Sequence, residues 1–398
     1  GTTGLPKAIV HSAGGTLLQH RKEHVLHAEL RPGDRFFYFT TCGWMMWNWL
    51  LSGLAEGAAL VLYDGSPVAR PDILWQMAAA EGVTHFGASA RYFAQLEADG
   101  IEPAADHDLS ALRCVLSTGS PLSPASFRWI YRSVGAELHL ASISGGTDIV
   151  SCFVLGNPAG AVCEGELQVP GLGMAVEIHA PGGDGIRQPP GVAGELVCTR
   201  PFPSMPLCFW GDAEGERFRS AYFERSPGVW SHGDWAEQRS SGGFVIHGRS
   251  DATLNPGGVR VGTAEIYRPL DPIAEVREAV AVALERPGGS GAGDVHIVLL
   301  VCLAEGVELD AALEQRIRGA IRAQASPRHV PARIVAVSDL PRTLSGKLSE
   351  LAVRDVLAGR EVTQRDALAN PASLDELGRL VRVRLADPLL ALTQGMID

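Results

Sequence analysis

ALRCVLSTGS, residues 111–120, combines an apolar run with a turn of small residues. The run 111–116 predicts a buried strand, and Ser117-Thr118-Gly119-Ser120 predicts the turn at its end. Farther out, GAALVLY at 57–63 predicts another buried strand. Two helices are predicted beside these strands, at residues 73–80 and 124–134. Because buried strands that alternate with helices are typical of an α/β layer, we predict an α/β fold.

A smaller β-rich part is predicted to follow this layer. Short strands are expected on both sides of the turn-rich segment PGGDGIRQPPG, at residues 175–178 and 194–198. The segment HGRSD (247–251) then marks a change of pattern.

Beyond this segment, Leu309, Leu313, Ile317 and Ile321 recur every four residues and predict one apolar face of a helix. Three more strands are predicted in the same region, at residues 276–284, 295–303 and 334–337. The sequence therefore predicts a small α+β unit over 251–361 that begins near Asp251. A charged helical tail is expected over 362–398.

Composition excludes some partners. The 398 residues include 34 basic and 45 acidic side chains, a net charge of −11, which argues against nucleic acid or an anionic membrane as the main partner. No stretch approaches the ~20 apolar residues that span a bilayer. The seven cysteines are scattered without metal-ligand spacing, and we expect reduced thiols in a cytoplasmic protein. The sequence makes no prediction about oligomeric state.

The first seven residues, GTTGLPK, combine glycines, hydroxyls and a lysine. Glycine N–H groups can approach an anion closely, hydroxyls add donors, and Lys7 supplies charge. Because Ala8 follows Lys7, the segment is not a GxxxxGK[ST] loop. An ordinary glycine-rich turn is the alternative interpretation.

Four further motifs offer groups that suit a nucleotide. SGGTD (144–148) has a hydroxyl and a carboxylate for a magnesium–phosphate ion, and WSHGD (230–234) has a carboxylate for ribose hydroxyls. GRSD (248–251) adds a cation and a possible pivot, and PRTLSGK (341–347) presents a lysine on a loop. Each has an alternative: turn caps for Asp148 and Asp234, a surface ion pair for Arg249, and a solvated side chain for Lys347.

In this order, the five motifs resemble those of the adenylate-forming acyl-CoA synthetase family, from residue 1 to about 350. GTTGLPK resembles the phosphate loop, SGGTD the magnesium motif, WSHGD the ribose motif, GRSDATLNPGGVRVGTAEIY the hinge segment and PRTLSGK the catalytic-lysine loop. Four segments are more closely similar to the members that act on acetoacetate: TTCGWMMWNWLLSGL, LASISGGTD, PFPSMPLCFWGD and HGRSDATLNPGGVRVGTAEIYR.

The resemblance implies ATP-dependent ligation of acetoacetate, or a similar short carboxylic acid, to coenzyme A, with Mg²⁺ as cofactor. An acyl-adenylate forms with release of pyrophosphate, and the CoA thiol then displaces AMP. Residues 1–250 would be the latter part of the large AMP-binding domain, with mixed sheets, helices and a small β subdomain, and 251–361 a mobile lid. In the family several hundred residues precede the phosphate loop, so we expect an N-terminally truncated chain. The alternatives are another short-chain acid, or a catalytically incompetent fragment that binds nucleotide.

The resemblance also implies roles for single residues around the phosphates. Thr2, Thr3 and Lys7 would hold the β- and γ-phosphates of ATP. Thr147 would contact the α-phosphate, and Asp148 would hold Mg²⁺ where most of the family has glutamate.

Asp234 would bind the ribose hydroxyls, with Arg249 at the same ribose or at the phosphate. The segment that would stack on adenine consists of Ser117, Thr118, Gly119, Ser120 and Pro121.

A second group of roles concerns the two half-reactions. Asp251 would be the hinge of the mobile lid, and Lys347 would contact the carboxylate and the α-phosphate during adenylation only. In the second conformation Gly258 would line the pantetheine tunnel, and Arg260 would face the nucleotide phosphate or CoA.

The acyl pocket is predicted around Trp44 and Gly145. Acetyl-specific relatives have a tryptophan at the position of Gly145, so we expect open space here for a longer acyl chain. Trp44, Trp47, Asn48 and Ser142 are candidates for recognising the 3-oxo group, and ordinary core positions are the alternative for them.

Overall fold

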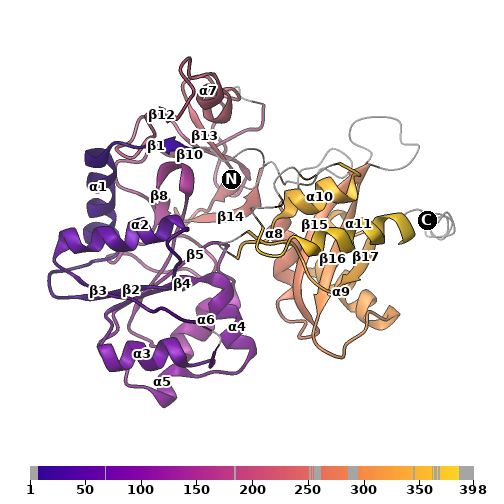
Figure 1. Ribbon diagram of the computed structural model, residues 1–398, viewed down its shortest axis with the longest axis horizontal. Helices are drawn as coiled ribbons and strands as arrows, with labels where there is room; N and C mark the ends of the chain where they lie inside the picture. The colour runs from indigo at the N-terminus through magenta and orange to yellow at the C-terminus, as the bar shows by residue number, and fades with distance from the viewer. Residues whose placement is uncertain are drawn as a thin grey trace. The chain divides into compact units, whose positions relative to one another are not determined.

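The computed structural model describes residues 8–67, 69–182, 185–250, 252, 254, 261–285, 295–343, 346–360, 362, 365 and 368–384. They form two compact units, Lys7–Asp251 and, for the most part, Ala252–Asp398 (Figure 1). The predicted roles of these ranges as an adenylation domain and a mobile lid stay predictions. In the part of the chain described here, no helix combines the length and apolar character needed to cross a membrane.

The first unit contains a parallel five-stranded sheet in the order β3-β2-β4-β5-β6. Its strands are β2 (Arg35–Tyr38), β3 (Ala59–Val61), β4 (His85–Ser89), β5 (Cys114–Thr118) and β6 (His139–Ser142). The strand predicted at 111–116 starts three residues later, because Leu112 N donates to Leu109 O in a preceding turn. The strand predicted at 57–63 is shorter, because Gly57 has φ +72° and ends a 3₁₀ turn.

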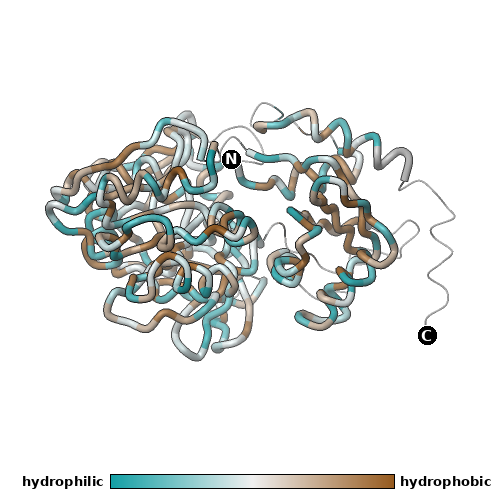
Figure 2. The backbone as a smooth tube through the Cα atoms, turned by 90° about the horizontal axis from the view of Figure 1, so that it is seen from below, coloured by the Kyte–Doolittle hydropathy of each residue, from teal (hydrophilic) through white to brown (hydrophobic). Residues whose placement is uncertain are grey.

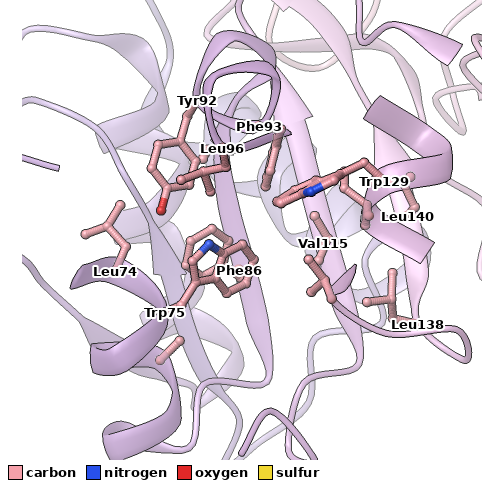
Figure 3. Close-up of a cluster of buried hydrophobic side chains, with 14 of the residues drawn as sticks. Leu74, Trp75, Phe86, Tyr92, Phe93, Leu96, Val115, Trp129, Leu138 and Leu140 are labelled. Carbon is pink, nitrogen blue, oxygen red and sulfur yellow. The ribbon is translucent and has the colours of Figure 1, made fainter. Parts of the chain in front are cut away.

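Helices cover both faces of this sheet (Figure 1). One face packs against α3 (Ile73–Glu81), α4 (Ala90–Ala98) and α6 (Pro124–Ser133), which confirms the two predicted helices. The other face packs against α2 (Met45–Ser52). In the first core the rings of Trp75 and Phe86 stack with centroids 4.1 Å apart (Figure 3).

Replacing Trp75 by alanine should lower the free energy of unfolding by about 3–5 kcal/mol, because its ring is fully buried and the space cannot close completely. Urea denaturation followed by circular dichroism measures this loss. Trp210→Ala is the matched control: its side chain is 76% exposed, and we expect a change within about 0.5 kcal/mol. Equal losses in the two variants would contradict the assignment of the core.

The rest of the first unit is rich in strands, as predicted, and these strands pair antiparallel. A four-stranded sheet has the order β10-β11-β13-β14, with strands Val176–His179, Gly194–Cys198, Trp230–Gln238 and Phe244–Arg249. A second sheet joins β7 (Ser144–Gly146), β8 (Ser151–Leu155) and β9 (Val169–Pro170), and β1 (Ile9–Val10) pairs with β12 (Cys208–Phe209). The other helices and turns are α1 (Ala13–Lys22), η1 (Glu23–His27), η2 (Gly53–Glu56), α5 (Pro103–Asp106), η3 (Thr147–Ile149) and α7 (Glu216–Phe223).

The second unit is built on a three-stranded sheet whose strands are hydrophobic along most of their length (Figure 2). The antiparallel strands β15 (Val276–Glu285) and β16 (Val295–Leu303) are followed by β17 (Arg333–Val337), which is parallel to β16. One face packs against α8 (Thr263–Tyr267), η5 (Arg268–Leu270) and α9 (Ala311–Gln324), and the other against α10 (Glu350–Leu357) and α11 (Ala372–Arg384). A 3₁₀ turn, η6 (Pro327–His329), precedes β17. Three of the four residues of the predicted apolar face, Leu313, Ile317 and Ile321, are buried on α9, whereas Leu309 precedes the helix and is half-buried.

Candidate active site

The turn after β5 lies at the carboxyl end of the parallel sheet, where ligands bind in open α/β folds. Thr118 Oγ1 donates to Ile143 O over 2.8 Å, which ties this end to the residue after β6. Gly119 has φ +93°, a conformation that favours glycine, and a Cβ atom added there would lie 3.6 Å from the Trp44 ring. Ser120 is exposed and Pro121 half-buried. The predicted adenine segment therefore begins in the core at Ser117 and reaches the surface at Ser120.

The magnesium motif lies on β7 and η3. Thr147 is exposed, and Asp148 is half-buried and accepts a hydrogen bond from the Tyr222 hydroxyl on α7. The Tyr222 ring stacks on Trp230 with centroids 3.8 Å apart. Burial, with a smaller contribution from Asp148, raises the pKa of Tyr222, so this hydroxyl keeps its proton and stays a donor.

The ribose motif lies on β13, opposite Arg249 on β14. Asp234 pairs with Arg249 across the two strands, and Arg249 Nη1 lies 3.2 Å from Asp234 Oδ1. The same nitrogen donates to His232 O over 3.1 Å. The Asp234 side chain is 11% exposed and that of Arg249 is 49% exposed. An ion pair is the alternative that the sequence left open for Arg249, and a role at the ribose stays a prediction.

His232 links the two motifs. Burial lowers its pKa, while the nearby carboxylates of Asp234 and Asp148 act in the opposite direction. Its Nε2 atom is 3.9 Å from Asp234 Oδ2, and a Cβ atom added at Gly146 would lie only 2.7 Å from Nε2. The structure thus brings Asp148, Asp234 and Arg249 together around one buried imidazole.

Gly145 lies on β7, opposite Cys152 of the paired strand β8. A Cβ atom added there would lie 2.0 Å from Ser151 O and 2.5 Å from Cys152 Cα, on the paired strand β8. A side chain at this position would therefore meet backbone rather than a pocket. The close pairing of β7 and β8 thus requires a glycine at this point, and room for the acyl chain beside Gly145 stays a prediction.

The other residues predicted for the acyl pocket or for 3-oxo recognition differ in their exposure to solvent. Trp44 is half-buried beside Tyr38, with ring centroids 6.1 Å apart, at the same sheet edge as Gly119. Trp47 is half-buried against the core of the second sheet face, Ser142 is buried and Asn48 is exposed. A role for Trp44 in the acyl pocket stays a prediction.

Lys347 belongs to the second unit and is exposed at the end of a tight turn. Thr343 N donates to Lys347 O over 2.8 Å, and Lys347 N donates to Thr343 Oγ1 over 3.1 Å. Arg342, at the start of the turn, is held by an ion pair with Glu278 on β15. The two hydrogen bonds tie the backbone of Lys347 to Thr343.

Six predicted site residues lie outside the described residues: Thr2, Thr3, Lys7, Asp251, Gly258 and Arg260. Among all the residues that the structure describes, no group of three or more His, Cys, Asp or Glu side chains is arranged to hold a metal ion. A metal that arrives with nucleotide phosphates needs fewer protein ligands, and one carboxylate such as Asp148 suits it.

Sequence reasoning did not identify the polar face of α1 and η1. This polar face is buried and consists of Gln19, His20, Glu23, His24 and His27. The opposite side exposes four apolar residues, Leu17, Leu18, Val25 and Leu26. The three- and four-residue spacing of the polar side chains was the available signal, although helices normally bury their apolar face.

His24 should make the protein less stable as the pH decreases. Burial lowers the pKa of His24 from 6.5 to about 3, with a smaller effect from the neighbouring His20. Between these values the unfolded chain binds a proton that the folded protein does not. The free energy of unfolding should therefore fall by about 1.4 kcal/mol per pH unit from this residue as the pH decreases. Urea denaturation at pH 6, 5 and 4 should show a shallower dependence in His24→Gln, and an unchanged slope would contradict this account.

The comparisons with known proteins agree with the motifs. Residues 1–206, more than half of the 398, match the family model described as AMP-binding enzyme. The chain belongs to the AMP-binding enzyme family. The family resemblance and the α/β fold predicted from the sequence are confirmed.

This member of the AMP-binding enzyme family is 59% identical over 377 residues to acetoacetyl-coenzyme A synthetase of Rhizobium meliloti, covering 94% of this chain and 57% of the relative. It is 48% identical to acetoacetyl-CoA synthetase of Danio rerio, covering 94% of this chain and 55% of the relative. The chain thus spans little more than half the length of these relatives. The solved structure of acetoacetyl-CoA synthetase from Streptomyces lividans matches with a TM-score of 0.88 and 46% identity, covering 96% of this chain and 58% of that one.

Proposed function

We propose that this AMP-binding enzyme ligates acetoacetate to coenzyme A through an acyl-adenylate and releases AMP and pyrophosphate. The observation that carries the proposal is the grouping of Asp148, Asp234 and Arg249 around His232, in a chain 59% identical to an acetoacetyl-coenzyme A synthetase. The turn 117–121 lies at the carboxyl end of the sheet, and its exposed residue, Ser120, offers a surface for adenine.

Three charged side chains, Asp234, Arg249 and Asp148, would hold the nucleotide and its metal ion. Asp234 would accept hydrogen bonds from the ribose hydroxyls, and Arg249 would balance the charge of Asp234 and face the ribose or the phosphate. Asp148, kept in place by Tyr222, would supply the carboxylate for Mg²⁺. When bound with ATP, this ion neutralises charge on the phosphates.

The first half-reaction joins two anions, since a carboxylate oxygen attacks the α-phosphorus and pyrophosphate leaves. The work of the protein is therefore positioning and charge neutralisation rather than proton transfer. Lys347 would supply positive charge at the carboxylate and the α-phosphate in this step. In the second half-reaction the thiolate of CoA attacks the mixed anhydride and AMP leaves. A lysine needed in one step only is consistent with a lid that moves between the steps.

ATP–pyrophosphate exchange with a panel of carboxylic acids tests this proposal. We expect exchange with acetoacetate well above that with acetate and butyrate. Higher exchange with another acid would overturn the substrate assignment while keeping the reaction class. No exchange with any acid would overturn the assignment of activity to this chain.

The second candidate function is nucleotide binding without catalysis. It is favoured by one observation, that the chain spans 57% of the length of the Rhizobium meliloti relative. Titration with AMP separates the two functions: binding together with exchange supports the ligase, and binding without exchange supports the second candidate.

A further inference from the structure

The buried polar face of α1 and η1 contacts the turn that carries the magnesium motif. His20 Nε2 lies 2.5 Å from Val150 O, and Cys152 N donates to Glu23 Oε1 over 3.3 Å. Both contacts are buried and join segments that lie far apart in the sequence. We infer that His20 and Glu23 are positioning residues that hold the Thr147–Asp148 turn in its binding conformation. This inference rests on the proposed function, in which Asp148 holds Mg²⁺.

The conformation of Val150 shows why this turn needs support. Val150 has φ +49°, a region that β-branched residues rarely adopt and that the surrounding structure must impose. Val150 N closes the 3₁₀ turn of η3 by donating to Thr147 O over 3.2 Å. The contact from His20 to Val150 O fixes the other end of the same residue. Asp148 therefore sits in a turn whose strained last residue is held by His20.

The hydrogen bond to Val150 O fixes the tautomer of His20. Val150 O can only accept, so His20 Nε2 carries the proton and Nδ1 is an acceptor. Ser52 Oγ lies 2.9 Å from His20 Nδ1 and also donates to Trp49 O over 2.7 Å, so its single proton serves one of these two acceptors at a time. His24 Nε2 lies 2.9 Å from both Ser52 Oγ and Trp49 O, and can donate to both. Burial lowers the pKa of His20, which agrees with a neutral ring.

Glu23 is the second anchor and is completely buried. Its carboxylate accepts from Gln19 Nε2 over 2.7 Å, from Trp49 Nε1 over 2.8 Å and from Cys152 N. Lys22 Nζ lies 3.8 Å away. These partners fix the carboxylate in one orientation, so it can hold β8 immediately after the turn. Glu23 begins the π-helix η1, a rare geometry that occurs frequently at functional sites.

Two variants of His20 separate positioning from packing. The amide nitrogen of glutamine reaches about as far as Nε2 of histidine, whereas that of asparagine reaches only about as far as Nδ1. His20→Gln should therefore keep the bond to Val150 O, and His20→Asn should lose it.

Two measurements on the 398-residue chain follow from this difference. In hydrogen–deuterium exchange, His20→Asn should raise uptake over residues 147–152 and leave β4 unchanged, while His20→Gln should match the parent. In ATP–pyrophosphate exchange with acetoacetate, His20→Asn should raise the Mg²⁺ concentration for half-maximal rate about tenfold or more, as removal of an outer partner of a metal-binding carboxylate does. His20→Gln should stay within about threefold of the parent, well below that effect.

The outcomes are distinguishable. Equal uptake over 147–152 in the parent and both variants would overturn the positioning role. An increase in uptake spread equally over this turn and β4 would overturn it too, since that result indicates a packing defect. If the parent chain shows no pyrophosphate exchange, the proposed function fails, and the uptake measurement still decides whether His20 holds the turn. Ser52→Ala, which removes the hydroxyl in contact with His20 Nδ1, should give a smaller local increase and serves if His20→Asn does not fold.

Discussion

Replacing Lys347 by alanine should lower acetoacetate-dependent ATP–pyrophosphate exchange by about 100-fold or more, the range seen when one group that stabilises transition-state charge is removed. The same variant should still form the thioester when it is given acetoacetyl-adenylate and CoA. Two separate assays on purified protein measure these half-reactions.

The physical reason is the charge that develops in the first step. A carboxylate approaches a triphosphate, so negative charge accumulates at the α-phosphorus and on the leaving pyrophosphate. Lys347 stands on a turn whose backbone is fixed by Thr343, and the ammonium group is the only part of the residue with charge to give. The second step discharges AMP from a mixed anhydride and has no need of the same cation.

The controls are a second cation and a conservative change. Arg322→Ala removes a positive charge from the exposed side of α9 in the same unit and should leave both half-reactions unchanged. Lys347→Arg keeps the charge but replaces a compact ammonium by a planar fork, so partial exchange activity is expected. Equal loss of both half-reactions in Lys347→Ala would show that the residue does not act in adenylation alone.

The elements that sequence reasoning located best are apolar runs that end at turn residues. Gly194–Cys198 and Val295–Leu303 have the predicted bounds because each is flanked by residues that stop a strand. Sequence reasoning also named Asp234 and Arg249 as candidate site residues. The structure places them at paired positions of an antiparallel hairpin, only 15 residues apart in the chain. Local sequence patterns are therefore informative when the interacting residues are close in the sequence.

Contacts between distant segments could not be predicted in this way. Tyr222 and Asp148 are 74 residues apart, and Glu23 and Cys152 are 129 apart, so nothing in either local pattern indicates the other. Gly145 illustrates a different limit: its missing side chain was interpreted as room for an acyl chain, and the structure adds a packing reason, because β8 lies too close for a Cβ atom. The packing reason for this glycine depends on a strand pairing that the residue alone does not indicate.

The second large effect is expected at Asp148. Asp148→Asn should lower the rate of ATP–pyrophosphate exchange by about 100-fold or more, because the carboxylate that would ligate Mg²⁺ loses its charge. The Mg²⁺ concentration needed for half-maximal rate should rise at the same time. Exchange measured over a range of Mg²⁺ concentrations reports both quantities.

The asparagine variant removes the negative charge of Asp148 and keeps its hydrogen bond to Tyr222. The Tyr222 hydroxyl donates to Asp148 Oδ1, and the amide oxygen of asparagine can accept the same hydrogen bond. Thermal unfolding of Asp148→Asn should therefore match that of the parent, while Tyr222→Phe should lose the hydrogen bond and keep the charge. Asp148→Glu restores the residue that most of the family has here and should retain much of the exchange activity. An asparagine variant with the parent's rate and Mg²⁺ dependence would remove Asp148 from the metal site, and the charge on the phosphates would then have to be balanced by cations such as Arg249.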